Sequence, residues 1–118
     1  QMKSTKVPSF NVIGNSPLVL RESLLDEVYT MGENFVEAAK RVVSPGMNGP
    51  FCIEGVYDEN AKFTSFEFSA RIVAGTNIYM DGSPYYSLLF NENMSMGKRI
   101  AREIKIAEEK NEIEKIVT

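Results

Sequence analysis

The chain has 118 residues, of which 43% are hydrophobic and 25% charged, a composition typical of one globular domain spanning residues 1–118. Its formal net charge of -3 gives no electrostatic reason to expect a nucleic-acid partner. With no histidine and one cysteine, the sequence excludes a Ser-His or Cys-His nucleophile pair and argues against a zinc site.

Two further limits come from the cysteine and the basic residues. Cys52 cannot form an internal disulfide, and no apolar run approaches membrane-spanning length, so we expect a cytoplasmic protein without a membrane partner. Lys98, Arg99 and Arg102 lie close together at helical spacing, which favours a solvated helix face. A bound metal would need oxygen ligands and would therefore be Mg2+ or Mn2+.

In chain order, the first predicted element is a short strand at residues 10–14. A helix follows from about residue 23 to 43, because apolar residues recur there at the spacing of one helical face. Ser23, with Asp26 three residues later, resembles a capping box. The residues expected to face inward are Leu25, Val28, Met31 and Phe35.

Two strands, at about 50–57 and 62–71, flank the turn-forming sequence DENA and predict a hairpin. Residues 74–94 are irregular, and long irregular segments in compact domains are often binding loops. This stretch holds Tyr79, Tyr85 and Tyr86. The last helix runs from about Ser95 into the 110s, with Met96, Ile100, Ala101 and Ile104 inward. These elements predict an α+β fold, an antiparallel sheet with helices on one face.

Pairing the two hairpin strands around their turn places Glu54 directly opposite Glu67. The other pairs in this register are Ile53 with Phe68, Gly55 with Phe66, and Tyr57 with Thr64. Two like charges facing each other repel, and a divalent cation would compensate for the repulsion. Two other interpretations stay open: carboxylates that only face water, or a salt bridge between Glu67 and Arg71.

Several stretches resemble a known family. CIEGVYDENAKFTSFEFSARIVAGTN resembles the end of the ATP-grasp catalytic module, where two acidic residues on neighbouring strands hold magnesium against the ATP phosphates. Together with GNSPLVLRESLL, GSPY and MSMGKRIAREIK, it makes the chain similar to the archaeal PurP family of formate-dependent ligases, over about residues 8–105. The resemblance implies a C-terminal ATP-grasp subdomain, with the upstream ATP-binding domains absent from this chain.

The resemblance also implies roles for individual residues. Glu54 and Glu67 match the two magnesium ligands, and Arg71 matches the catalytic arginine that steadies charge on the transferred phosphoryl group. Ser69 stands where the superfamily usually has asparagine, so its part as a phosphate or metal contact is in doubt. Asn15 matches a contact to the nucleotide substrate, although the residues alone favour a plain turn residue there.

Other polar residues have two interpretations. Thr76 and Asn77, after Gly75, could donate to a phosphate or another anion, as could Ser83, but turn chemistry explains all three equally well. Cys52 shares a strand face with Glu54, and nothing nearby in the sequence would lower its pKa, so we interpret it as a packing residue.

The implied reaction is the formylation of 5-aminoimidazole-4-carboxamide ribonucleotide by ATP and formate through formyl phosphate, which releases ADP and phosphate. These substrates would be the partners, with magnesium as cofactor. The chain has no counterpart of the lysines and hinge that hold ATP in ATP-grasp enzymes, so we expect this part alone to be inactive and to self-associate as a homo-oligomer. The alternative is a non-catalytic ATP-grasp-derived binding or assembly module.

Overall fold

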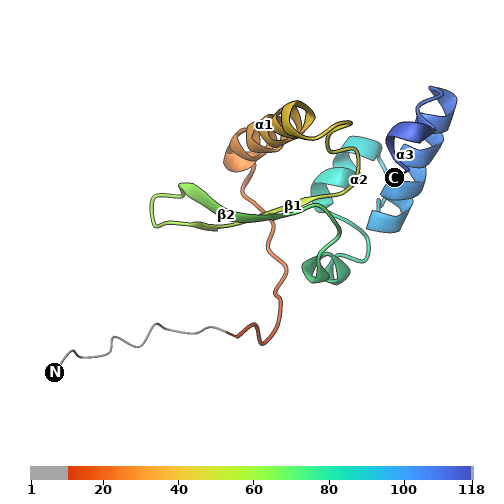
Figure 1. The fold of residues 1–118 in the computed structure, drawn as a ribbon. Helices are drawn as coiled ribbons and strands as arrows, with labels where there is room; N and C mark the ends of the chain where they lie inside the picture. The colour runs from red at the N-terminus through yellow and green to blue at the C-terminus, as the bar shows by residue number, and fades with distance from the viewer. Residues whose placement is uncertain (1–10, 118) are drawn as a thin grey trace.

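The computed structural model describes residues 11–117, apart from the side chain of Asn77. Helices and one two-stranded antiparallel sheet make up this part of the chain (Figure 1), so the α+β class is confirmed. In chain order the elements are η1 (Glu22–Leu24), α1 (Leu25–Val42), β1 (Cys52–Tyr57), β2 (Phe63–Ser69), η2 (Ala74–Ile78), α2 (Pro84–Phe90), α3 (Met96–Glu109) and η3 (Ile113–Lys115), where η marks a 3-10 turn. Among the described residues, no helix combines the length and the apolarity needed to cross a membrane.

Helix α1 begins without the predicted capping box. Ser23 lies inside η1, and the N-cap residue Leu24 makes no side-chain capping hydrogen bond. The capping-box prediction is therefore wrong. The first turn of α1 instead carries two acidic residues and its last turn two basic ones, an arrangement that stabilises the helix through its dipole.

The predicted strand at residues 10–14 is wrong where the structure can test it. Phe10 lies outside the described residues, and residues 11–14 have no regular secondary structure. The sheet in the described part of the chain contains β1 and β2 alone, so this segment has no neighbouring strand. A strand without a neighbour leaves its backbone groups unpaired within the protein.

Asp58 closes the hairpin turn between β1 and β2. Its Oδ1 accepts hydrogen bonds from the backbone N–H groups of Asn60 and Lys62, both at 2.9 Å. Ala61 takes the left-handed conformation, with φ of 59°. The aspartate side chain thus replaces backbone partners in the turn, as the sequence DENA predicts.

A β-bulge lies immediately beside Glu54. The predicted pairs Ile53–Phe68 and Glu54–Glu67 are confirmed. The predicted pairs Gly55–Phe66 and Tyr57–Thr64 are wrong, and the observed pairs are Gly55–Ser65, Val56–Thr64 and Tyr57–Phe63. Phe66 is the extra residue of β2, and its side chain is 67% exposed.

The bulge lies where β1 has no side chain. A Cβ on Gly55 would lie 2.3 Å from Cζ of Phe63 and 2.6 Å from the carbonyl oxygen of Thr64. The Phe63 ring also packs against Tyr57, with ring centroids 5.0 Å apart. Glycine at position 55 therefore lets the aromatic ring and the backbone of β2 approach β1 closely.

Replacing Gly55 by alanine is expected to lower the free energy of unfolding by about 1–3 kcal/mol, because the new methyl group overpacks the contact with β2. Urea unfolding followed by circular dichroism measures the change. Gly32→Ala is the matched control: a Cβ there meets nothing within 4 Å, in the interior of α1. The control should gain roughly 1 kcal/mol. Equal stability of the two variants would contradict this explanation of the bulge.

Helix α1 lies over one face of the hairpin (Figure 1). Its contact with that face is made by Phe35. The Phe35 ring centroid lies 4.8 Å from that of Phe51 and 5.0 Å from that of Phe68. An open groove of about 490 Å³, lined by Val28 and Ile53 among others, lies between α1 and β1. The predicted packing of α1 on this face is confirmed for Phe35 and Phe68. It is wrong for Phe66, which is the bulge residue.

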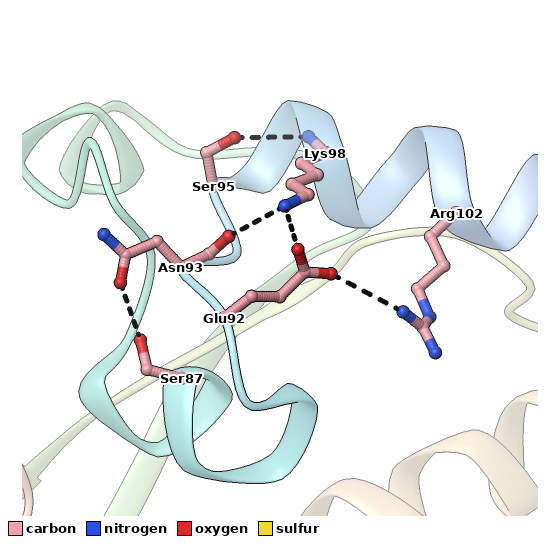
Figure 2. Close-up of polar contacts among 6 residues, drawn as sticks. All are labelled: Ser87, Glu92, Asn93, Ser95, Lys98 and Arg102. Carbon is pink, nitrogen blue, oxygen red and sulfur yellow. Dashed lines mark hydrogen bonds and ion pairs between the residues drawn. The ribbon is translucent and has the colours of Figure 1, made fainter.

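Charged residues hold the corner between α2 and α3 (Figure 2). The Glu92 carboxylate accepts a hydrogen bond from the Lys98 ammonium and lies 3.9 Å from Nη1 of Arg102. Lys98 Nζ also donates to the carbonyl of Asn93 at 3.3 Å, and Ser95 Oγ caps α3 by accepting from the Lys98 N–H. The hydrogen bond and charge of Lys98 hold the pKa of Glu92 below its usual value. The basic side chains of Lys98 and Arg102 therefore have acidic or carbonyl partners within the chain.

Few side chains in the described part of the chain are buried. The buried apolar residues there are Met94 and Ala107. Ala101 and Ile104, which were predicted to face inward, are exposed. Large apolar side chains that are at least 70% exposed are Val12, Ile13, Leu18, Val42, Met80, Leu88 and Leu89. Exposed apolar side chains of this kind are candidates for contact with another surface.

Candidate functional site

Two glutamates pair across the strands on the face of the hairpin that α1 does not cover. Glu54, half-buried, lies directly opposite Glu67, which is exposed. Successive side chains of a strand point to opposite faces, so both glutamates point away from Ile53 and Phe68. Directly opposite residues of antiparallel strands have Cβ atoms about 4.5–5.5 Å apart, which is within reach of one shared cation. The neighbouring bulge is a feature that often re-aims side chains beside active sites.

Cys52 and Ser69 extend this face by one cross-strand pair. They lie opposite each other at the outer end of the hairpin, and both are half-buried. Partial burial and the negative charge of Glu54 raise the pKa of the Cys52 thiol. A raised pKa favours the protonated thiol, which agrees with a packing role. Ser69 places a hydroxyl on the same face as Glu67.

Arg71 follows β2 by two residues and is exposed. Its Nη1 donates a hydrogen bond to the backbone carbonyl of Ile72 at 3.0 Å. The ion pairs found within residues 11–117 do not include one between Arg71 and Glu67, so the salt-bridge interpretation of Glu67 is wrong in this structure. Among these residues, no further hydrogen bond from the Arg71 guanidinium group is recorded.

The donors on this face fit magnesium. Mg2+ prefers oxygen ligands, and proteins usually hold it with one or two carboxylates while waters and substrate phosphates fill the other positions. Glu54 and Glu67 supply two carboxylates, and Ser69 adds a hydroxyl. In the part of the chain that the structure describes, no group of three or more Asp, Glu, His or Cys side chains could enclose a metal. Two carboxylates would leave the other positions of a bound magnesium ion open to waters or phosphate oxygens.

Asn15 lies in the segment that leads into α1. The segment has no helix or strand before η1, and residues 11–19 are exposed. Among the described hydrogen bonds, none involves the Asn15 amide, and the structure records no contact between Asn15 and the two glutamates. Close to Asn15 in the chain, the backbone of Leu18 and Leu20 forms hydrogen bonds with side chains of the segment 74–95.

The other sequence-predicted polar residues lie in or near the first turns of short helices. Thr76 is half-buried in η2, where its N–H donates to the carbonyl of Val73. Asn77 belongs to η2 as well, but its side chain lies outside the described residues. Ser83 Oγ accepts from the Tyr85 N–H as the N-cap of α2, so turn chemistry accounts for it.

Sequence reasoning missed the anchoring role of two tyrosines. The Tyr79 hydroxyl accepts a hydrogen bond from the N–H of Leu18 at 2.7 Å and donates one to the Leu18 carbonyl at 2.8 Å. The Tyr85 hydroxyl donates to the carbonyl of Leu20. A cavity of about 420 Å³ lies between this segment, α1 and residues 75–96, and Thr76 is among its lining residues. The only signal in the sequence was the concentration of tyrosines in an irregular stretch.

Related proteins support the resemblance to the PurP family. The 5-formaminoimidazole-4-carboxamide-1-(beta)-D-ribofuranosyl 5'-monophosphate synthetase of Nitrosopumilus maritimus is 86% identical over 118 residues, which are 100% of this chain and 35% of that protein. The synthetase of the same name from Cenarchaeum symbiosum is 71% identical over 118 residues, again 100% of this chain and 35% of that protein. The chain thus spans about a third of the length of the curated relatives it matches.

A solved structure and a family model extend the comparison. The crystal structure of an IMP biosynthesis protein PurP from Thermococcus kodakaraensis matches with a TM-score of 0.72 and 34% sequence identity, over 93% of this chain and 36% of that one. The resemblance to the archaeal PurP family is therefore confirmed. The model of the family described as "Domain of unknown function (DUF1297)" matches residues 1–118. Because this match includes every residue, the chain belongs to the DUF1297 family.

Proposed function

We propose that this chain is the C-terminal part of an ATP- and formate-dependent ATP-grasp ligase of purine biosynthesis. The longer protein formylates 5-aminoimidazole-4-carboxamide ribonucleotide through formyl phosphate and releases ADP and phosphate. The observation that carries the proposal is the 86% identity, over the whole chain, with a synthetase named for the formylated nucleotide. The open pair of carboxylates on the hairpin supports it, since ATP-dependent phosphoryl transfer needs a metal held against phosphates.

In this proposal Glu54 and Glu67 hold the magnesium ion from neighbouring strands. The ion would neutralise charge on the ATP phosphates as the terminal phosphoryl group passes to formate. Ser69 lies on the same face and contributes a hydroxyl for a hydrogen bond to a metal-bound water or a phosphate oxygen. Arg71, exposed at the end of β2, turns its guanidinium toward the transferred phosphoryl group or the formyl phosphate and stabilises its negative charge.

Substrate recognition falls to residues outside the hairpin. Asn15 binds the carboxamide of the nucleotide, since an amide side chain can both donate to and accept from another amide. Thr76 and Asn77 are the further candidates for contacts to phosphate. We propose no role in chemistry for Ser83, whose hydroxyl already caps α2.

The partners that we propose are small molecules: ATP, formate and the aminoimidazole nucleotide. We also propose a cytoplasmic protein that associates with further copies of itself. The exposed apolar side chains on α2, Leu88 and Leu89, support an additional contact surface. A non-catalytic ATP-grasp-derived binding or assembly module is the second candidate, and the exposed apolar side chains of α2 would suit it equally well.

An activity assay on the longer protein separates the two candidates. With ATP, Mg2+, formate and 5-aminoimidazole-4-carboxamide ribonucleotide together, we expect ADP release and the formylated nucleotide, measured by coupled absorbance and by chromatography. Omitting formate should reduce ADP release to background, because the phosphoryl group then has no acceptor, and omitting the nucleotide should abolish the formylated product. Formate-independent turnover would contradict the ligase, and the absence of turnover with full ligand binding would favour the module.

A further inference from the structure

The segment 11–21 depends on other parts of the protein for its position. It has no regular secondary structure, and its side chains are exposed as far as Val19. Within the described part of the chain, the hydrogen bonds recorded for residues 11–20 all come from two tyrosine hydroxyls 61 and 65 residues away. The path of this segment is therefore set by Tyr79 and Tyr85 rather than by local structure.

Tyr79 binds the backbone of the segment in the way that a neighbouring strand would. One hydroxyl oxygen meets both the N–H and the carbonyl of Leu18, at 2.7 and 2.8 Å. In an antiparallel ladder, one residue likewise exchanges both of its backbone groups with a single partner. Because the contact is made with the backbone, it fixes the position of the chain whatever side chain stands at residue 18.

Both tyrosines are themselves held in ordered turns. Tyr79 ends η2, where its N–H donates to the carbonyl of Thr76 at 3.2 Å and its own carbonyl accepts from the N–H of Gly82 at 3.0 Å. Tyr85 lies in the first turn of α2, with its N–H bonded to the Ser83 hydroxyl. Ordered backbone at the base of each ring gives its hydroxyl a defined position.

We propose that Tyr79, supported by Tyr85, is a positioning residue for recognition of the nucleotide, because it fixes Leu18 and through it Asn15. This proposal rests on the proposed function, in which Asn15 binds the carboxamide. Three residues of extended chain span at most about 10 Å, so an anchor at Leu18 limits where Asn15 can lie. The same tyrosines border the cavity that Thr76 lines. Their hydrogen bonds therefore hold the segment that carries Asn15 next to the part of the chain that carries Thr76, the other candidate substrate contact.

The test uses Tyr79→Phe in the longer protein, with Tyr86→Phe as the matched control. Tyr86 lines the same cavity, but no hydrogen bond of its hydroxyl is recorded within residues 11–117, so the control removes an equal group without the anchor. In Tyr79→Phe we expect the KM for the nucleotide to rise about tenfold while kcat and the KM for ATP change less than about threefold. Tyr85→Phe should give a smaller rise of the same kind.

Hydrogen exchange, measured by mass spectrometry on the same proteins, follows the anchor independently of activity. Peptides covering residues 11–21 should exchange faster in Tyr79→Phe and not in Tyr86→Phe. Unchanged exchange would overturn the anchor. Faster exchange with an unchanged KM for the nucleotide, or a parallel rise in every KM, would overturn the positioning role while leaving the proposed function standing. A parent protein without formate-dependent activity would overturn the proposed function and the positioning role, while the exchange result would still decide whether the anchor exists.

Discussion

In the longer protein, replacing Glu67 by glutamine is expected to lower formate-dependent ADP release by at least about 100-fold. The amide keeps the shape of the side chain but removes one of the two negative charges that face each other across β1 and β2. Glutamine is a weaker ligand for Mg2+ than a carboxylate. Initial rates of ADP release at saturating ATP, formate and nucleotide measure the loss.

Glu59→Gln provides the control for this prediction. Glu59 lies in the turn of the same hairpin, is exposed, and takes part in no ion pair recorded among the described residues, so the variant removes the same charge away from the site. Its activity should stay close to that of the parent. Partial recovery of Glu67→Gln at higher Mg2+ would identify a lost metal ligand rather than a damaged fold. More than a tenth of the parent activity in Glu67→Gln at low Mg2+ would contradict the metal assignment.

The 118 residues alone are expected to release no ADP and to bind ATP with a Kd of about 1 mM or weaker, near -4 kcal/mol. Their contribution to ATP binding is a metal held by two glutamates, with Arg71 nearby, which leaves little free energy after the cost of association. Isothermal titration calorimetry with ATP and Mg2+ measures the affinity, and circular dichroism verifies the fold of the sample. Light scattering should also detect self-association through the exposed apolar side chains.

The comparison for this prediction is the longer protein under identical conditions. There, ATP should bind at least about tenfold more tightly, a difference of 1.4 kcal/mol. Micromolar ATP affinity in the 118 residues, or ligase turnover by them, would mean that the chain contributes far more of the nucleotide site than the hairpin and its neighbours supply.

Hydrophobic periodicity predicted the elements that depend on a repeating pattern. Helices α1 and α3 and the hairpin follow it, and α3 begins within one residue of its predicted start at Ser95. The pairing of Glu54 with Glu67 was predicted from a register that is one residue off beside the turn, and it is correct because the bulge at Phe66 shifts the register by one residue beyond Gly55. Their metal role stays a prediction, since a register places two side chains together without showing what they bind.

The bulge and α2 were not predictable by the same reasoning. In the sequence, Phe66 and Phe68 alternate as if both lay on one face of the strand. The bulge at Phe66 goes with the close approach of Phe63 to Gly55, a contact that exists only in three dimensions. Helix α2 has seven residues, too few for periodicity to reveal, although the Ser83 cap with Pro84 after it was a usable signal. The contact of Tyr79 with Leu18 joins residues far apart in the chain, which local patterns cannot report.

The extra residue at Phe66 also separates the length of β2 from the position of the glutamates. On the turn side, Phe63 packs against Tyr57 and close to Gly55, while on the other side Glu54 keeps its partner Glu67. Every observed cross-strand pair on the two sides of Phe66 would also be found in a regular ladder without that residue, so deleting Phe66 would leave the pairs in place and remove only the bulge. The hairpin can therefore lose or gain one residue at this point without separating the two glutamates.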